Sequence, residues 1–498
     1  IVLPRAVEGR VCNLLQRIVA AEIVQHKLIK ASTNIGPCHG LLRSYPVEHQ
    51  LAHASSAYHL AETKEPTAIF CNDARGEYAA IYLGRAEGGR IRKIKCFYHP
   101  DSLCGMYAAM TDYLGFEILD GEQKVMGIAA YGDQEKYDLS WLARFVGKDF
   151  RVDTRLITTI GLRRYKARSK GHYFSAKLVE KLGPRRVGNL LEDPYVHYAA
   201  AIKKLYEDIA IGLIETYLGE TLNESGRIAV AGTGAMNIRL NQRIRAHPLV
   251  EEVIVHPACG DSGTAIGAAA WAVRAAGLSI EPVTHMRMGP SFSNNECLRA
   301  CMAIEKILLW ETVENPHKKA AELLVAGELV AWFRGAMEFG PRALGNRSIL
   351  ASPIRHGVID AINQQVKFRE QWRPFSPSIL ESVAEQMLPD GVHDEYMLFN
   401  TAVDWQWQQR YPAIVNRDGS TRAQVVRQKN NPDFHRLLVC FQQKSGHGLL
   451  INTSLSRPGE ALICTPGDAL NMFTGTDLNY MIMENVLVSK RKISQKWQ

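Results

Sequence analysis

Features that define several common classes of protein are missing from this 498-residue chain. No stretch approaches the roughly 18 consecutive apolar residues that a membrane-spanning helix needs, and the first residues lack the charged, apolar and small-residue succession of a signal peptide. The ten cysteines are scattered and form no CxxC pair, which argues against a disulfide framework or a structural zinc site. We therefore expect a cytoplasmic protein with free thiols and no membrane segment.

Low-complexity sequence, internal repeats and a sharp basic cluster are also absent. The formal net charge is only +8, and the densest basic runs, at residues 163–166 and 490–492, are short enough to be solvated faces. The charge of the chain therefore does not favour nucleic acid as a partner. With 46% hydrophobic and 22% charged residues, the composition is that of a globular protein, and the length suits two to four domains of roughly 150 residues.

The order of the apolar segments predicts an α/β protein. Strands are expected at residues 67–73, 78–84, 228–231 and 253–256, and the last two each run into a glycine-containing turn and then a helix. This alternation places ligand-binding loops at the carboxyl ends of the strands. Further helices are expected near residues 11–29, 45–58, 195–218, 264–276 and 318–326. Helix breakers between residues 277 and 295 mark a boundary, which gives domains at 1–284 and 285–498.

Two histidines and two carboxylates form a candidate metal site. His49 and His53 are four residues apart, so on a helix both imidazoles face the same side. The pair alone fits two hydrogen-bonded histidines on a buried face equally well. Asp73 and Asp261 each follow an apolar strand, where a buried carboxylate needs a partner. Mixed nitrogen and oxygen ligands suit iron, manganese or zinc, and the sequence does not choose among them.

Two glycine loops in the same half of the chain favour nucleotide binding. The sequence at residues 232–237, GTGAMN, lies between an apolar strand and a helix, where backbone amides and a helix N-terminus can hold a phosphate. The sequence GDSG at residues 260–263 repeats this arrangement. One such loop would be no more than a tight strand-to-helix connection.

The second half of the chain carries cations interleaved with glycine, proline and aromatic residues. They stand in the segments 334–348 and 366–375. A solvated face would not normally combine these residue types. Guanidinium groups match the paired oxygens of phosphate or carboxylate, and a lysine adds a mobile charge, so we predict a polyphosphate pocket here. Its members are Arg342, Arg347, Lys367, Arg369 and Arg373.

Taken together, these motifs resemble the NodU/CmcH/TobZ family of O-carbamoyltransferases. The resemblance runs from about residue 45 to the C-terminus. Six stretches carry it: EHQLAHA at 48–54, EQKVMG at 122–127, HPACGDSG at 256–263, EFGPRALG at 338–345, residues 367–375, and NTS at 452–454. It implies a truncated domain of the actin-like ATPase (ASKHA) superfold, similar to the TsaD enzyme that transfers threonylcarbamoyl to tRNA, followed by a YrdC-like α/β domain.

The resemblance also implies an activity. The YrdC-like domain would condense carbamoyl phosphate with ATP, used with Mg²⁺, into carbamoyl adenylate, releasing pyrophosphate and phosphate. The first domain would transfer the carbamoyl group to a hydroxyl of a sugar or secondary metabolite, which makes a small-molecule acceptor the expected partner. A tRNA-modifying protein of the threonylcarbamoyl type and a degenerate nucleotide-binding scaffold are the alternatives. A homodimer stays open.

Site residues follow from the resemblance position by position. His49, His53, Asp73 and Asp261 would bind a metal, with Fe²⁺ the ion implied. Arg342, Lys367, Arg373, Arg422, Asn452 and Ser454 would contact carbamoyl phosphate and ATP, with Arg347 and Arg369 beside them. Lys124, Gly127, Gly232, Gly234 and Asn237 would hold the adenylate in the first domain. For the general base, the nearest candidates are His59 and Glu122.

The sequence departs from the family pattern at three positions. The family's first strand and His-Asp loop have no match before residue 45, and the chain begins with Ile1, so we expect that an amino-terminal segment is missing from the sequence. Thr233 interrupts the family's double glycine, where a side chain would enter the space of a closely approaching adenylate. Ser456 replaces the asparagine usual after the NTS turn, and its hydroxyl can still donate a hydrogen bond.

Overall fold

The computed structural model of the chain describes residues 46–490, apart from positions 62, 78, 159–170, 189–190, 304–307, 371, 374 and 392–393. The helix predicted over residues 11–29 lies outside these described residues. The chain forms two compact units, Ile1–Pro282 and Val283–Gln498. Each unit has its own sheet and its own hydrophobic core. The mixture of strands and helices confirms the predicted α/β class.

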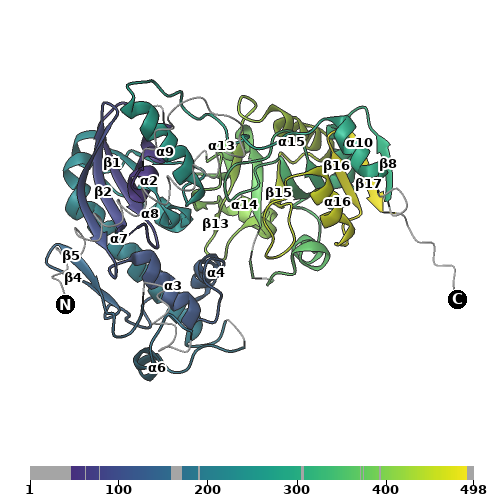
Figure 1. The fold of residues 1–498 in the computed structure, drawn as a ribbon. Helices are drawn as coiled ribbons and strands as arrows, with labels where there is room; N and C mark the ends of the chain where they lie inside the picture. Colours follow the sequence, from purple (N-terminus) through teal and green to yellow (C-terminus); the bar gives the residue numbers. More distant parts are fainter. Residues whose placement is uncertain are drawn as a thin grey trace. The chain divides into compact units, whose positions relative to one another are not determined.

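A five-stranded sheet in the order β3-β2-β1-β6-β7 forms the centre of the first unit (Figure 1). The central strand β1 pairs antiparallel with β2 and parallel with β6, while β3 and β7 lie at the edges. The strands are β1 (Thr67–Asn72), β2 (Ala79–Glu87), β3 (Arg90–Tyr98), β6 (Arg227–Ala231) and β7 (Glu252–Val255). All six residues of β1 are buried, because both faces of the sheet are covered.

Helix α2 (His49–Tyr58) covers one face of this sheet, with α9 (Ser262–Ala275) packed against it. Ile69 and Cys71 of β1 belong to the core that α2 shares with the sheet. Successive strand residues point to opposite faces, so the odd-numbered side chains of β1 face α2. The contact between α2 and α9 is very close: a Cβ atom at Gly267 would lie 1.9 Å from the carbonyl oxygen of Ala52.

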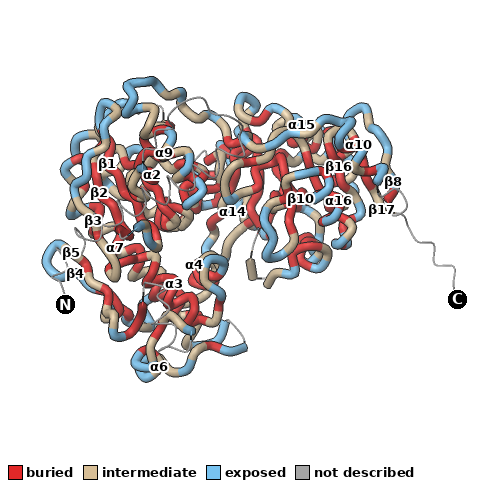
Figure 2. Tube along the Cα trace, in the orientation of Figure 1, coloured by how far each residue is buried: buried red, intermediate tan, exposed pale blue. Residues whose placement is uncertain are grey.

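The long helix α7 (Tyr195–Ser225) covers the opposite face. Asn72, at an even-numbered position of β1, donates from Nδ2 to the hydroxyl of Tyr206 on α7 at 2.9 Å. The buried residues of this unit gather in β1, β2 and α7 (Figure 2). Its other helices and strands are α3 (Leu103–Tyr113), α4 (Gly121–Ile128), β4 (Ala143–Val146), β5 (Asp149–Val152), α6 (Ala176–Leu182), the 3-10 turn Thr233–Met236 and α8 (Ile238–Arg245).

An eight-stranded mixed sheet in the order β14-β11-β15-β10-β9-β16-β17-β8 forms the centre of the second unit. Its strands are β8 (Leu308–Thr312), β9 (Val330–Phe333), β10 (Arg347–Ala351), β11 (Ser376–Leu380), β14 (Gln424–Val426), β15 (Leu449–Ser454), β16 (Tyr480–Met483) and β17 (Val486–Lys490). A two-stranded sheet of β12 (Thr401–Ala402) and β13 (Ser420–Thr421) accompanies it.

Helices α11 (Pro316–Val325) and α15 (Pro432–Ser445) pack against each other in this unit, as do α10 (Asn294–Met302) and α16 (Pro466–Thr474). A π-helix, Asn363–Lys367, continues directly from α12 (Val358–Ile362) and ends at the predicted phosphate-binding segment. The remaining short helices are α13 (Glu381–Met387) and α14 (Trp405–Arg410).

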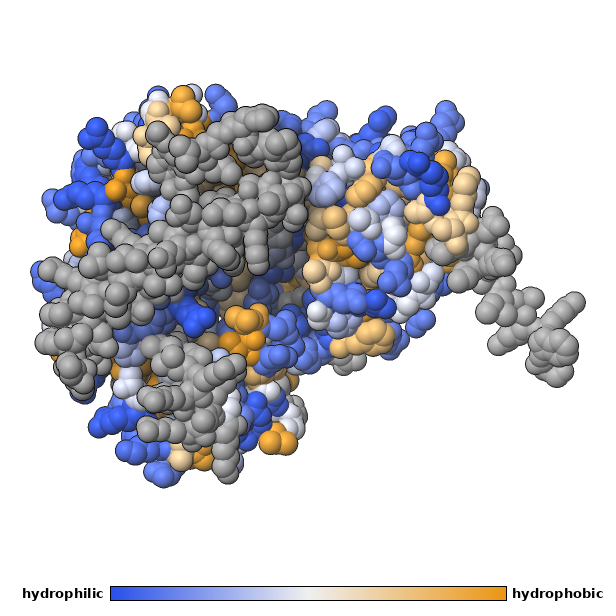
Figure 3. Space-filling view, in the orientation of Figure 1, coloured by the Kyte–Doolittle hydropathy of each residue, from blue (hydrophilic) through white to orange (hydrophobic). Residues whose placement is uncertain are grey.

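The described helices were compared with the length and hydropathy of a membrane span. Among the residues that the structure describes, none of the helices combines the length and the apolar character needed to cross a bilayer. On the face shown in Figure 3, hydrophobic residues form small separate patches among hydrophilic ones.

Candidate functional site

The amino-terminal candidate site begins where strand β1 ends beneath helix α2. Asp73 follows directly after β1 and continues the odd-numbered alternation, so its side chain points toward α2. His49 and His53 stand one turn apart on the facing side of that helix. Asp261 approaches the same point from the N-terminus of α9, which packs against α2. We call these four residues the His/Asp tetrad.

The donor atoms of the His/Asp tetrad all lie within 4.8 Å of one another. Nε2 of His49 and Nε2 of His53 are 3.0 Å apart, and they lie 2.9 and 3.1 Å from Oδ2 of Asp73. Oδ1 of Asp261 is 3.5 and 3.7 Å from the same two nitrogens. The structure therefore brings together four side chains that are up to 212 positions apart in the sequence.

These separations suit a single metal ion. Two ligand atoms that each lie about 2.1 Å from an ion, at right angles to each other, are about 3.0 Å apart. Three of the measured separations match this value closely, and those to Asp261 are slightly longer. Two imidazole nitrogens and two carboxylate oxygens form a donor set suited to Fe²⁺, Mn²⁺ or Zn²⁺. The residues present thus fit the kind of ion that the sequence implied.

The close approach of the four side chains shifts the pKa values of the tetrad residues. Burial lowers the pKa of His49, but hydrogen bonds and charge attraction with Asp261 and Asp73 outweigh this and raise it to about 10. The pKa of His53 is raised against burial by the same two carboxylates. Burial alone would raise the pKa of Asp73, but hydrogen bonds from both imidazoles hold it well below its usual range. A bound cation would replace the protons of these imidazoles.

Asp261 differs from its prediction in two respects. The sequence suggested a buried carboxylate at the end of a strand, but β7 ends at Val255, and Asp261 is the residue before the first turn of α9. Its side chain is 74% exposed, whereas that of Asp73 is 3% exposed. The tetrad therefore has a buried side, which includes Asp73, and an exposed side at Asp261.

Thr233 makes a contact with the tetrad that the sequence did not reveal. Its hydroxyl donates a hydrogen bond of 2.6 Å to Oδ1 of Asp73, the oxygen that does not face the histidines. The backbone N–H of Ala74 donates to the same oxygen at 2.7 Å. The sequence suggested only that Thr233 interrupts a glycine loop, and the pairing becomes visible once β1 and β6 lie side by side.

The glycine loop after β6 is shaped by its close approach to β1. Gly232 has φ +86°, and a Cβ atom there would lie 2.4 Å from the carbonyl oxygen of Asn72. Gly234 packs against the same residue. Asn237 caps α8, because its side chain accepts the N–H groups of Arg239 and Leu240.

The other two adenylate candidates, Lys124 and Gly127, lie on α4. The ammonium group of Lys124 pairs with Asp120 at 2.9 Å. Since α4 packs against α7, these residues belong to the helical layer on the face of the sheet opposite α2.

The two candidates for the general base are held by local contacts. His59, next after α2, has Nδ1 2.8 Å from the Ser55 hydroxyl and donates from Nε2 to the carbonyl of Gly89 at 3.2 Å. Both oxygens of Glu122 accept the backbone N–H of Leu119. Burial raises the pKa of Glu122. Nothing in these contacts directs either side chain to the tetrad.

In the second unit, Lys367 is buried at the end of the π-helix and anchored to the end of β15. Its ammonium group donates to the carbonyl oxygens of Ser454 and Ser456, at 2.6 and 2.7 Å, and lies 3.0 Å from the Ser454 hydroxyl. Burial, with a smaller contribution from Arg369, lowers its pKa well below the usual value. A π-helix is rare and often occurs at a functional site.

Four arginines of this unit interact electrostatically, and we call them the arginine cluster: Arg422 is repelled by Arg342, Arg369 and Arg373. Arg369 also repels Lys367. Burial and repulsion by the other three lower the pKa of Arg422 well below its usual value, and Asp394 opposes this only in part. Nε of Arg422 donates to the Ser376 hydroxyl at 2.9 Å, which fixes its orientation. Positive charges brought together in this way match an anionic ligand with several oxygens.

The other predicted residues of this site have different surroundings. Arg347 is fully buried: its guanidinium lies over the Phe333 ring, 3.6 Å from the centroid, and donates to carbonyl oxygens including those of Arg334 and Pro290. Asn452 donates to the Ser378 hydroxyl at 2.9 Å inside the sheet. The contacts of Arg347 are those of a structural residue, whereas Ser454 lies beside Lys367.

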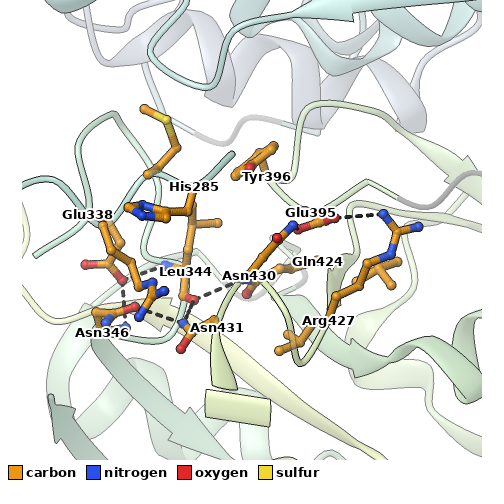
Figure 4. Close-up of a pocket in the computed structure, with 14 residues that line it drawn as sticks. His285, Glu338, Leu344, Asn346, Glu395, Tyr396, Gln424, Arg427, Asn430 and Asn431 are labelled. Atoms are coloured by element: carbon orange, nitrogen blue, oxygen red, sulfur yellow. Dashed lines mark hydrogen bonds and ion pairs between the residues drawn. The ribbon is translucent and has the colours of Figure 1, made fainter. Parts of the chain in front are cut away.

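Glu338 shapes the loop that carries Arg342. Its Oε1 accepts three backbone N–H groups, from Leu344, Asn346 and Arg347, at 2.8 to 3.1 Å. Figure 4 shows this carboxylate beside a small pocket, next to Asn346 and His285. One side chain thereby fixes the turn in the motif EFGPRALG, which explains the glutamate at its start.

Comparisons with known proteins find family models that match most of both units. A family model described as the carbamoyltransferase N-terminus matches residues 7–270, and one described as the carbamoyltransferase C-terminus matches residues 321–490. The first match begins well before residue 45, where the motifs begin. The chain is 30% identical to Nodulation protein NolO of Bradyrhizobium diazoefficiens over 91% of this chain and 80% of that protein.

Two other relatives show similar agreement. The chain is 31% identical to an uncharacterized protein of Synechocystis sp., over 91% of this chain and 78% of the relative. It is 30% identical to Nodulation protein NolNO of Sinorhizobium fredii, over 90% of this chain and 64% of that protein. The chain belongs to the carbamoyltransferase family, the NodU/CmcH group that the sequence motifs suggested. It is therefore an enzyme, and its reaction is carbamoyl transfer.

Proposed function

We propose that this protein is an ATP-dependent O-carbamoyltransferase. In the second unit, carbamoyl phosphate, ATP and one water molecule would form carbamoyl adenylate, pyrophosphate and phosphate. The water would release phosphate from carbamoyl phosphate, and an oxygen of the resulting carbamate would displace pyrophosphate from the α-phosphorus of ATP. In the first unit, the carbamoyl group would pass to a hydroxyl of a sugar or another small metabolite, leaving AMP. The observation that carries the proposal is the pairing of two sites in one member of this family: the His/Asp tetrad and the arginine cluster.

The topology of the first unit supports an actin-like ATPase domain. Three antiparallel strands, β3, β2 and β1, are followed in the same sheet by the parallel strands β6 and β7. The glycine loop that follows β6 lies at the carboxyl end of a parallel strand, which is where such sheets bind ligands. We propose that the mixed sheet of the second unit is YrdC-like, with the arginine cluster as its phosphate site.

The cations of the second unit suit adenylate formation. Carbamoyl phosphate and ATP, used with Mg²⁺, are both polyanions, so their approach is opposed by charge repulsion. Arg342, Arg373 and Arg422 would offset this repulsion and stabilise charge that develops on the transferred phosphoryl oxygens. Lys367 would hold Ser454 in place, since its ammonium group is bound to that residue already. The unfavourable crowding of the arginines would be relieved when the anions bind.

In the first unit, the tetrad would hold the metal ion, which we propose is Fe²⁺. A bound ion supplies Lewis-acid polarisation of a carbonyl oxygen. Asp73 would be the fixed ligand, because it is buried and held by Thr233 and Ala74. Asp261, at the exposed side, would leave room for the carbamoyl donor and the acceptor.

The proposal is tested by separating the two half-reactions in the full chain. We expect carbamoyl adenylate and pyrophosphate to form from ATP when carbamoyl phosphate, Mg²⁺ and Fe²⁺ are supplied without an acceptor, and AMP to form when an acceptor is added. With candidate hydroxylated metabolites added, mass spectrometry should show a product heavier by one carbamoyl group. Arg422→Met should abolish pyrophosphate release, and Asp73→Asn should retain pyrophosphate release but lose transfer.

Arg436→Met serves as the matched control, because this exposed arginine lies on α15 and belongs to neither site. It should leave both half-reactions unchanged. Absence of carbamoyl-phosphate-dependent pyrophosphate release by the folded wild-type chain would refute the adenylate route.

A further inference from the structure

A cationic groove lies in the first unit, separate from the tetrad and the loop after β6. Its volume is about 720 Å³, within the range of small-molecule sites. The walls come from the hairpin of β4 and β5, from residues 153–156, and from α6. Its lining residues are Trp141, Arg144, Val146, Arg151, Val152, Asp153, Thr154, Arg155, Leu156, Lys177, Glu180 and Lys181.

Positive charge is concentrated in the part of the sequence that contains the residues lining this groove. Residues 141–181 contain eleven lysines and arginines but only three acidic residues, a net charge of +8, and five of these eleven cations, at positions 163–170, lie outside the described residues. The rest of the chain contains 48 residues of each sign, so this one segment holds the entire excess of positive charge. The described lining alone has five cations against two carboxylates. Such asymmetry indicates an anionic ligand more strongly than the modest total charge does.

Two of the five cations are held in place by acids. Arg151 donates to Asp101 at 2.9 Å, and Arg155 makes two hydrogen bonds to Asp153, at 3.0 and 2.6 Å. Pairing with Arg155 also lowers the pKa of Asp153, so that carboxylate stays ionised and neutralised. These arginines are thereby oriented before any ligand arrives, which reduces the entropy lost on binding.

The other three cations are available to a ligand. Arg144, Lys177 and Lys181 are exposed, and no ion pair with a carboxylate is found for them within the described residues. They stand on two different walls, β4 and α6, and so face the groove from separate directions. The ammonium group of Lys181 lies 4.7 Å from the centre of the Trp141 ring, which holds this side chain at the rim.

The walls are joined by contacts that do not depend on a ligand. Ile157 and Phe174 form a β-bridge, the N–H of Ser175 donates to the carbonyl of Leu156, and the Ser175 hydroxyl donates to the carbonyl of Arg155. The residue preceding α6 is thus fixed to the loop that follows β5. A groove whose walls are tied in this way is a preformed site.

We propose that this groove binds a small polyanion, a molecule with two or more phosphate or sulfate groups. A groove of this volume with cations on opposite walls fits a ligand of disaccharide size that carries anionic groups at its ends. The duplex or hairpin of a nucleic acid would need a broader track of cations. This site is additional to the phosphate site proposed for the second unit, and its test does not depend on catalysis.

Calorimetry on the full chain tests the proposal with two probes, sucrose octasulfate and inositol hexakisphosphate, at low and at physiological salt. We expect one site per chain for at least one probe, and the affinity should fall as salt rises. The two probes distinguish a sulfate site from a phosphate site. The triple substitution R144A/K177A/K181A should weaken binding about tenfold, because it removes three exposed cations that would each form an ion pair with the bound probe. Hydrogen exchange should slow in residues 141–158 and 171–182 when the probe is bound.

The matched control is R90A/R92A/K93A, which removes three exposed cations from β3 in the same unit. It should leave probe binding within about twofold of wild type, because its charges act only at long range. Equal weakening by both triple variants would overturn the proposal, as would failure of both probes to bind. Tight binding of a 20-nucleotide RNA hairpin, lost in R144A/K177A/K181A while the small probes do not bind, would assign the surface to nucleic acid instead. Thermal unfolding confirms that each variant is folded.

Discussion

The substitution Thr233→Val tests whether the tetrad is supported from behind. Valine keeps the shape of threonine but removes the hydroxyl that donates to Oδ1 of Asp73 at 2.6 Å. Asp73 is almost fully buried, so this oxygen would retain one donor, the N–H of Ala74. A hydrogen bond to a charged group contributes about 1.5–3 kcal/mol. Loss of a partner behind a metal ligand typically weakens metal binding about 10- to 100-fold, or about 1.4–2.8 kcal/mol.

Metal affinity is measured by competition between the protein and a chromophoric chelator for Fe²⁺ without oxygen, and for Co²⁺. We expect Thr233→Val to bind both ions about 10- to 100-fold more weakly and Thr233→Ser to bind them as the wild type does. Thr216→Val is the matched control, because that hydroxyl donates to the carbonyl of Gly212 within α7, away from the tetrad. If Thr233→Val bound both ions as tightly as wild type, Thr233 would not position Asp73.

Three further predictions concern stability. Arg422→Met should raise the free energy of unfolding of the unliganded protein by roughly 1–2 kcal/mol, because it relieves buried repulsion; a destabilised variant in urea titration would contradict this. Burial raises the pKa of Asp394 to about 6 in the folded state. Between about pH 4 and pH 6 the Asp394 carboxyl therefore holds a proton in the folded state but not in the unfolded state, and the stability that this proton contributes is lost as pH rises. The unfolding free energy of wild type relative to Asp394→Asn should therefore fall by up to roughly 3 kcal/mol from pH 4 to pH 7, and a difference that does not change with pH would count against it. Gly267→Ala should lower the free energy of unfolding by about 3 kcal/mol, because its Cβ atom would force α9 away from α2. Gly219→Ala on α7, which has open space around its Cβ atom, should be neutral or stabilising when both variants are compared by thermal unfolding.

Local sequence patterns were sufficient for the elements around the tetrad. The spacing of His49 and His53 predicts a shared helix face, and the apolar run before Asp73 predicts a strand, and both elements are confirmed. The motif EFGPRALG at residues 338–345, which contains Arg342, predicts a glycine-rich turn beside cations. These features depend on neighbours within a few residues, which is the range over which periodicity carries information.

The burial of a side chain and the groups that it contacts could not be predicted from local sequence patterns. The sequence predicted that Arg347 contributes to a phosphate pocket, yet Arg347 is buried over an aromatic ring and bonded to carbonyl groups. Asp261 is exposed although it follows a strand and a loop rich in small residues. Both outcomes depend on which element packs above the residue, and that element is distant in the sequence.

The sequence by itself determined the family, the α/β class and the candidate ligands. Only the tertiary structure decided that Thr233 supports Asp73, since β1 and β6 are neighbours in the sheet but lie more than 150 residues apart. Only the tertiary structure likewise places the hairpin of β4 and β5 beside α6, so that cations from both line one groove. The physical reason is the same in each case: residue types define what a side chain can bind, but the packing of distant elements decides which groups face it.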